Sequence, residues 1–252
     1  VSHSSMGDYL RCPRAYYLRN VYRDPRNNHR MTLMQPALAL GQAVHEVIEA
    51  LSVLPVSERL NRSLLDEFDR VWLGVSGEKG GFSNSEEELA YKTRGKNMLS
   101  RVMKHPGPLG RKATKIREPL PNFLLSEEDN IILCGKIDWL EHDEKTDSIY
   151  VLDFKTGKMD ERPDSLQLPI YYLLAKRTQK RPVAGVRYWY IDRDDRPIDM
   201  PLPDENEGRK RILEVAKMIA LARKLERFVC NKKDGCAACK PMEAIKLGKG
   251  KF

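Results

Sequence analysis

The sequence lacks any long hydrophobic run. Its longest apolar stretch covers residues 170–175, far short of the ~18 residues that a membrane-spanning helix needs, so we expect no membrane span. The first residues, Val-Ser-His-Ser-Ser-Met, contain no basic segment followed by a hydrophobic one, and no secretory signal is predicted. Repeats and low-complexity segments are lacking too, which excludes a repeat architecture. We therefore expect a cytoplasmic protein.

Cysteine is scarce, with 5 residues in a chain of 252. A chain of this length can bury a substantial core as one large domain or a domain with an elaboration, which excludes a small disulfide-stapled module. In a reducing compartment, the thiols are expected to be free or to bind metal. Hydrophobic residues make up 41% and charged residues 32% of the chain, as in a folded rather than a disordered protein.

Acidic residues are outnumbered by basic ones, 36 to 44, which gives a net charge of +8. The excess lies in two segments: residues 1–30 hold six arginines against two aspartates, and residues 207–234 hold nine basic against four acidic residues. A charge-rich segment is commonly just a solvated surface. Two such segments that meet in the fold would instead suit the phosphate backbone of DNA.

The spacing of apolar residues changes along the chain. The first half shows helical spacing, with a first helix capped by Ser4 or Ser5, and the segment after residue 110 favours strands. The strands over 131–140 and 149–154 flank a polar stretch and are predicted to form a hairpin. This order predicts an α/β fold. The remaining predicted elements are helices over 38–54, 60–72, 86–103, 166–176 and 207–227 and strands over 112–118 and 183–191.

Two aspartates are predicted to face each other across this hairpin. If its turn is centred on residues 144–147, paired residue numbers sum to about 291, which places Asp138 opposite Asp153. Lys155 then shares a face with Asp153. Opposed like charges destabilise a sheet unless a cation compensates, and carboxylates suit Mg²⁺ or Mn²⁺. The alternative is a pair of solvent-facing carboxylates near strand ends, and a slip by one residue would separate them.

These residues resemble the PD-(D/E)XK nuclease superfamily, in particular its RecB-like branch. Asp138 matches the first acidic position and Asp153-Phe-Lys155 the (D/E)-x-K motif, with Asp in place of the commoner Glu. The resemblance implies a mixed central sheet with flanking helices, a catalytic lysine, and His45, Asp138 and Asp153 as ligands of Mg²⁺ or Mn²⁺. It also implies that Gln167 and Tyr171, a Gln-x-x-x-Tyr motif, contact the DNA backbone. For Tyr171, packing in the core is an equal alternative.

Three of the cysteines, Cys230, Cys236 and Cys239, lie within ten residues. A tetrahedral sulfur site needs a fourth ligand, for which Cys12 is the candidate, and the residues alone permit either Zn²⁺ or an iron–sulfur cluster. The pattern is similar to that of the AddB nuclease domain and the CRISPR-adaptation nucleases, which implies a 4Fe-4S cluster and makes Zn²⁺ the less favoured occupant. Cys134 is expected to be a core residue.

The predicted organisation has three parts. These are a helical region over 1–110 with Cys12 and His45, a nuclease core over 111–200, and a C-terminal helix with the cysteine cluster over 201–252. The resemblance implies a metal-dependent deoxyribonuclease acting on single-stranded DNA or DNA ends, with exonuclease favoured over endonuclease action. DNA repair, recombination or CRISPR adaptation, with a protein partner, is the implied setting. The alternative is a catalytically silent iron–sulfur DNA-binding or assembly subunit.

Overall fold

The chain divides into two compact units, each assembled from segments distant in the sequence. The computed structural model describes residues 1–114, 116, 118 and 120–248. Unit 1 comprises residues 1–33, 122–135 and 204–252, and unit 2 comprises residues 34–121 and 136–203. Cys12 and His45, which the sequence placed in one region, therefore lie in different units. The three-part division at residues 110 and 200 stays a prediction, because compactness does not test which segments fold alone.

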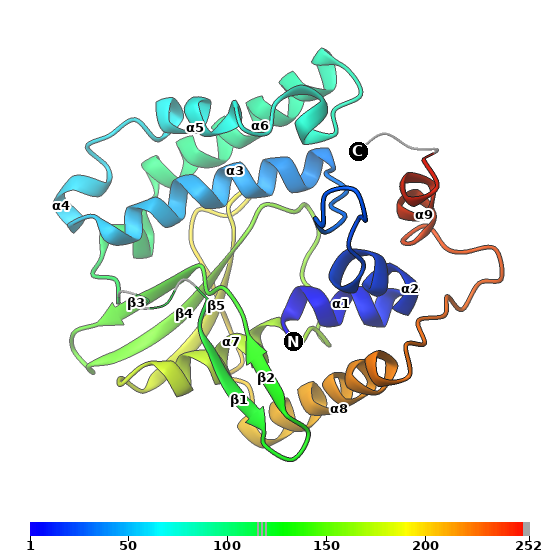
Figure 1. The fold of residues 1–252 in the computed structure, drawn as a ribbon. Helices are drawn as coiled ribbons and strands as arrows, with labels where there is room; N and C mark the ends of the chain where they lie inside the picture. Colours follow the sequence, from blue (N-terminus) through cyan, green and yellow to red (C-terminus); the bar gives the residue numbers. More distant parts are fainter. Residues whose placement is uncertain (115, 117, 119, 249–252) are drawn as a thin grey trace. The chain divides into compact units, whose positions relative to one another are not determined.

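Unit 1 contains a small helical core and a β-hairpin (Figure 1). The first helix is capped by Ser2, not by Ser4 or Ser5 as predicted: the Ser2 side chain accepts from the Ser5 amide, and Ser5 Oγ accepts from the Ser2 amide. This reciprocal pair satisfies two amides that would otherwise lack partners. The elements of unit 1 are α1 (His3–Arg11), α2 (Pro13–Tyr16), a π-helical turn (Tyr17–Val21), β1 (Asn122–Ser126), β2 (Ile131–Cys134), α8 (Glu205–Lys224) and α9 (Lys240–Lys246).

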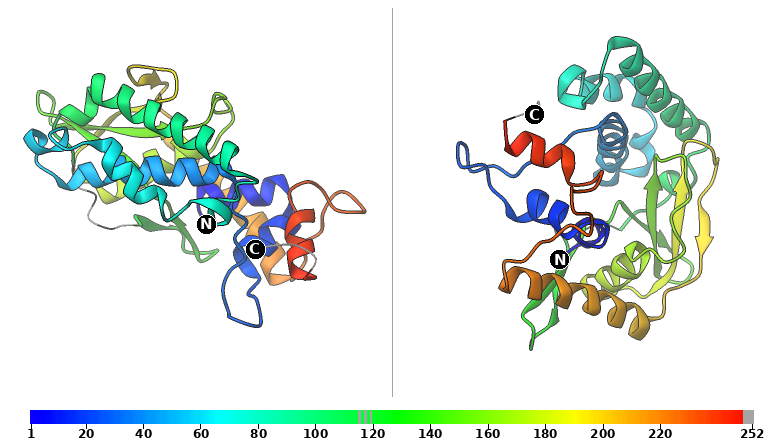
Figure 2. Two further views of the ribbon diagram at one scale, coloured as in Figure 1. Left: turned by 90° about the horizontal axis from the view of Figure 1, so that it is seen from above. Right: turned by 90° about the vertical axis from the view of Figure 1, so that its right-hand side faces the viewer.

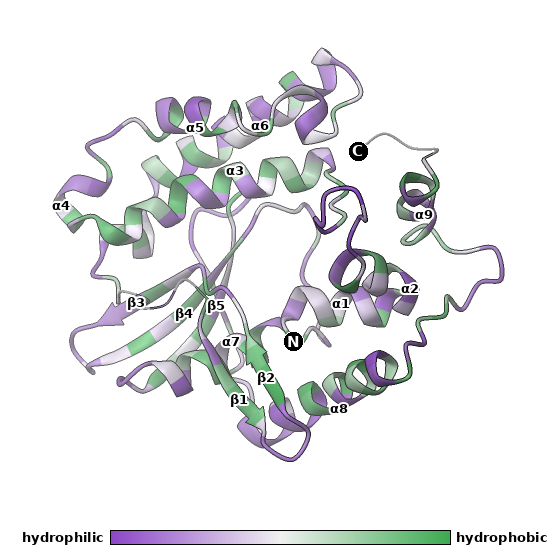
Figure 3. Cartoon of the chain, viewed as in Figure 1, coloured by the Kyte–Doolittle hydropathy of each residue, from purple (hydrophilic) through white to green (hydrophobic). Residues whose placement is uncertain are grey.

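Unit 2 is a layered α/β structure. Helices α3, α5 and α6 pack on one another in one layer (Figure 1, Figure 2), and hydrophobic and polar residues alternate along α3 (Figure 3), as expected for a helix with one buried face. Its elements are α3 (Pro36–Ala50), α4 (Val56–Arg59), α5 (Leu64–Trp72), α6 (Ser85–Lys104), β3 (Trp139–Asp143), β4 (Ser148–Lys155), α7 (Gln167–Thr178), β5 (Val183–Tyr190) and β6 (Ile198–Met200), with short 3₁₀ turns at Leu51–Val53, Gly77–Gly80 and Gly107–Gly110.

The sheet of unit 2 is mixed, which confirms the predicted α/β fold class. Its order is β3-β4-β5-β6, and β4 pairs parallel to β5 while the outer pairs are antiparallel. Leu152, Phe154 and Trp189 join the core formed with α3, α5 and α6. Because side chains alternate along a strand, Asp153 and Lys155 point to the other face, where α7 packs on β4 and β5.

The predicted hairpin register is confirmed, but the first strand of the hairpin, predicted over 131–140, is shorter in the structure. Trp139 pairs with Leu152 and Leu140 with Val151, so the paired numbers sum to 291. Residues 131–134, however, form β2 and pair with β1 in unit 1. Of the strand predicted over 112–118, Ala113 makes an isolated bridge to Glu141, while residues 115 and 117 lie outside the described residues. Among the described helices, none is long and apolar enough to cross a bilayer.

Candidate functional site

The two predicted carboxylates lie on neighbouring chain segments of unit 2. Asp153 stands within β4, and Asp138 directly precedes the first paired residue of β3. The Asp138 side chain turns back to β4, where its Oδ2 accepts a hydrogen bond from the Phe154 amide at 2.9 Å. Asp138 is 8% and Asp153 2% exposed. Burial of two nearby carboxylates is costly without compensation, which argues against the solvent-facing alternative.

The first residue of α7 joins the predicted catalytic residues in one network. Gln167 Nε2 donates to Asp153 Oδ1 at 2.8 Å and to the Tyr171 hydroxyl at 3.3 Å, while Gln167 Oε1 accepts from Lys155 Nζ. Lys155 Nζ also lies 3.0 Å from Asp153 Oδ2 and 3.0 Å from a carboxylate oxygen of Glu161. Gln167 and Tyr171 are four residues apart and share a helix face. Glu161 was not identified from the sequence.

A second group of polar side chains converges on Asp138 from α3. His45 Nδ1 lies 3.3 Å from Asp138 Oδ2 and 4.0 Å from Glu49 Oε1. One nitrogen of His45 and one oxygen each of Glu49 and Asp138 lie within 4.8 Å of one another. Asp153, the third ligand predicted from the sequence, is not part of this group. Glu49, which the sequence reasoning missed, follows His45 by one helical turn and also pairs with Lys136.

Burial and neighbouring charges together shift the pKa values of the ionisable side chains in this site. Burial, and then the Asp138 charge, raise the pKa of Asp153 to about 7. Burial lowers the pKa of His45, but the charge and hydrogen bond of Asp138 outweigh it and raise this pKa to about 9. For Lys155, burial is likewise outweighed by Asp153, and the pKa is raised. Burial raises the pKa of Tyr171, which keeps its hydroxyl neutral.

The donor atoms of this site fit a divalent cation. Carboxylate oxygens suit Mg²⁺ and Mn²⁺, and imidazole is a common ligand of divalent transition metals. Asp153 Oδ2 is buried and makes no hydrogen bond, although Lys155 Nζ lies 3.0 Å away. Burial apart, the negative charge of Asp138 raises the pKa of both His45 and Asp153, as is expected where neighbouring carboxylates attract a cation. A bound cation would supply positive charge in place of protons.

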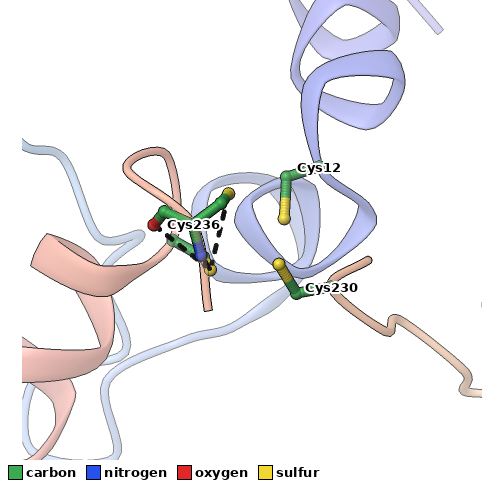
Figure 4. A group of neighbouring side chains, drawn as sticks. Cys12, Cys230 and Cys236 are labelled. Atoms are coloured by element: carbon green, nitrogen blue, oxygen red, sulfur yellow. Dashed lines mark hydrogen bonds between the residues drawn. The ribbon is translucent and has the colours of Figure 1, made fainter. Parts of the chain in front are cut away.

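The four predicted cysteine ligands converge within unit 1. Cys12 ends α1 and caps α2, Cys239 precedes α9, and Gly235 adopts a positive φ of 80° in the turn before Cys236. The four sulfur atoms all lie within 4.8 Å of one another, and those of Cys12 and Cys230 point toward each other (Figure 4). This arrangement can hold a metal centre. Cys134 lies outside the group on β2, half-buried rather than in the core as predicted, with its thiol 3.4 Å from the Val1 carbonyl.

Both basic segments belong to unit 1, beside an aromatic cluster. Tyr16 stacks on Phe228 with ring centroids 6.0 Å apart, and Tyr17 lies 5.1 Å from the same ring. A pocket of about 610 Å³ adjoins this cluster. Its charged lining includes the basic residues Arg14, Lys232, Lys233 and Lys240 and the acidic residues Asp234 and Glu243.

Comparison with known proteins identifies a family. A family model described as the PD-(D/E)XK nuclease superfamily matches residues 1–243. The search of curated proteins found no matching relative. The matched range contains the carboxylates, the lysine and the four converging cysteines.

Proposed function

Because the chain belongs to the PD-(D/E)XK nuclease superfamily, we propose that it is a metal-dependent deoxyribonuclease. Nucleases of this superfamily use divalent metals, and DNA is the substrate we propose. The observation that supports the proposal best is the contact network of unit 2, in which Gln167 bonds both Asp153 and Lys155. A silent relative would not need to keep a charged network buried in its core.

His45, Glu49, Asp138 and Asp153 are the proposed metal ligands. The first three place their donor atoms within 4.8 Å of one another, and Asp153 has a buried oxygen, Oδ2, that faces the Lys155 ammonium at 3.0 Å. Mg²⁺ or Mn²⁺ supplies Lewis acidity toward the phosphate when it is bound. The Phe154 amide fixes Asp138 through the hydrogen bond to Oδ2, so this ligand is held in place by the backbone of the neighbouring strand.

Lys155 is proposed to act as a cation rather than as a base. Its pKa is raised because Asp153 and Glu161 outweigh burial, so the ammonium stays protonated at neutral pH. A protonated lysine can donate hydrogen bonds to an attacking water and to the phosphate, and it can neutralise charge that develops in the transition state. Its ammonium also lies 4.8 Å from the centre of the Tyr188 ring, which limits where the side chain can move.

Gln167 and Tyr171 are proposed to position the reacting groups and the DNA strand. Both are buried, with exposures of 7% and 8%, so most of their surface contacts protein. Tyr171 accepts from Gln167 Nε2, the atom that also donates to Asp153. The Asp153 carboxylate orients the Gln167 amide, because the reverse orientation would place the amide oxygen against it.

The basic segments of unit 1 are proposed to bind DNA that is single-stranded or has free ends. Lysines and arginines suit the phosphates of such a strand, and the partly exposed Tyr17 beside them suits stacking on an unpaired base. Exonuclease action is proposed in preference to endonuclease action. The resemblance extends the proposal to DNA repair, recombination or CRISPR adaptation with a protein partner.

The test compares Asp153→Ala and Lys155→Ala with variants in the turn of the same hairpin. Glu144→Ala and Lys145→Ala remove like charges from exposed positions and serve as matched controls. Each protein is incubated with Mn²⁺ and either end-labelled linear single-stranded DNA or circular single-stranded DNA, which has no ends. DNA binding is measured separately, without metal. Loss of cutting with binding retained, in the active-site variants only, supports the proposal. Equal cutting by all four variants contradicts it, and a wild-type chain that binds but never cuts favours the silent subunit.

A further inference from the structure

The distances among the four cysteine sulfurs distinguish two kinds of metal centre. Around a single Zn²⁺, with Zn–S bonds of about 2.3 Å, the edge of the sulfur tetrahedron is about 3.8 Å. In a 4Fe-4S cluster each thiolate binds a different iron. The sulfurs are then separated by an iron–iron edge in addition to the bonds, so they lie further apart than around one ion.

The observed sulfurs are close together. All four lie within 4.8 Å of one another, and the Cys236 and Cys239 sulfurs are 3.8 Å apart, which equals one edge of the zinc tetrahedron. Between these two residues the chain forms a tight loop, in which the Cys236 amide donates to Cys239 Sγ at 3.2 Å. The loop therefore holds these two sulfurs at the separation that one Zn²⁺ requires.

We propose that Cys12, Cys230, Cys236 and Cys239 bind one structural Zn²⁺ in place of the 4Fe-4S cluster that the resemblance implies. Four thiolates in a tetrahedron are the donor set that Zn²⁺ prefers, and four protein ligands leave no open position for a substrate. Two of the ligands, Cys12 and Cys239, are nearly inaccessible, with 2% and 1% exposure. A cluster would require the four sulfurs to lie further apart than they do.

The ion would fasten the first helices of unit 1 to its last segment. Cys12 and Cys239 pack in one core with Leu18, Met31 and Met242, and the metal adds a crosslink between residue 12 and residues 230–239. Because such a site is not preformed in the unfolded chain, its binding free energy stabilises the fold. Zn²⁺ has no redox chemistry, so the crosslink would persist in air.

The first test is the metal content of the full chain purified without oxygen from cells supplied with both iron and zinc. We expect about one zinc per chain, no acid-labile sulfide, and no absorption band near ~400 nm. About four iron and four sulfide per chain, with that band, would overturn the proposal. A single iron without sulfide, or a chain with no metal, would overturn it as well.

The second test uses variants and cobalt. Cys236→Ser is expected to lose the zinc and to lower the melting temperature, whereas Cys134→Ser, a matched control outside the group, keeps both. If Cys236→Ser does not fold, wild-type protein reconstituted with Co²⁺ provides the readout, because tetrahedral thiolate coordination gives strong visible bands and oxygen coordination does not. Absence of these bands contradicts the proposal. Asp153→Ala retains the zinc in either case, so failure of the nuclease proposal would be seen separately.

Discussion

The Gln167 amide connects the two charged groups of the proposed active site, and its removal gives the sharpest test of that site. Nε2 donates to Asp153 Oδ1 at 2.8 Å and Oε1 accepts from Lys155 Nζ. Gln167→Leu keeps the side chain's approximate volume but deletes both bonds. Tyr171 also loses its contact with Nε2 at 3.3 Å.

The expected loss follows from the charges of these partners. A hydrogen bond to a charged group contributes about 1.5–3 kcal/mol. Lys155 keeps Glu161 and Asp153 as partners, each at 3.0 Å, so we expect the two lost bonds to cost less than their sum, about 2–3 kcal/mol. If the transition state loses the same stabilisation, kcat falls by roughly 30- to 150-fold.

The assay measures kcat and KM for Mn²⁺-dependent cutting of single-stranded DNA, with the free energy of unfolding measured in parallel. Gln179→Leu is the matched control at the other end of α7, where the amide contacts Thr178 Oγ1 at 3.5 Å. We expect kcat of the Gln167 variant to fall with little change in KM. For the Gln179 control, we expect both kcat and KM to stay at their wild-type values. A Gln167 variant that is less stable but keeps wild-type kcat would show that this residue only packs, and would refute the positioning role.

Three further predictions concern metal binding, packing and pH. Glu49→Gln removes one proposed ligand charge and should weaken Mn²⁺ binding by roughly 10- to 100-fold in calorimetry, and unchanged affinity would exclude Glu49 as a ligand. Gly95→Ala places a methyl group 2.4 Å from Phe68 Cζ and should lower the unfolding free energy by about 1–3 kcal/mol, whereas Gly157→Ala, which meets nothing within 4 Å, should not. Without metal, stability should fall as pH rises from about 4 to 7, because folded Asp153, with a pKa of about 7, retains a proton that the unfolded chain has lost. Asp153→Asn should flatten this pH profile in thermal unfolding.

The hairpin that holds the carboxylates was predictable because a turn determines its register. The polar stretch between two apolar runs placed the turn, and the confirmed pairing of Trp139 with Leu152 follows from it. Asp138 itself is not paired in the ladder. Its position depends on the bond to the Phe154 amide, which hydrophobic periodicity does not encode.

Other features depended on contacts that a sequence pattern cannot reveal. Residues 131–140 form an apolar run interrupted by Gly135, Lys136 and Asp138, and only the pairing of β2 with β1 shows that it contains two strands in different units. Glu49 lies one turn after His45, but acidic residues are common on helices. It becomes a candidate ligand only because α3 brings it beside Asp138.

The donor atoms of the two candidate metal centres explain how one chain could load two different ions. The site in unit 2 offers carboxylate oxygens and one imidazole, while the site in unit 1 offers four thiolates. Hard ions such as Mg²⁺ bind oxygen and dehydrate reluctantly, whereas thiolates select softer ions. Of the proposed ligands, His45 makes the two sites less different, since imidazole also suits Zn²⁺. We therefore expect the carboxylates of Glu49, Asp138 and Asp153 to determine which metal the proposed site binds, because each adds charge and oxygen donors that favour a hard cation.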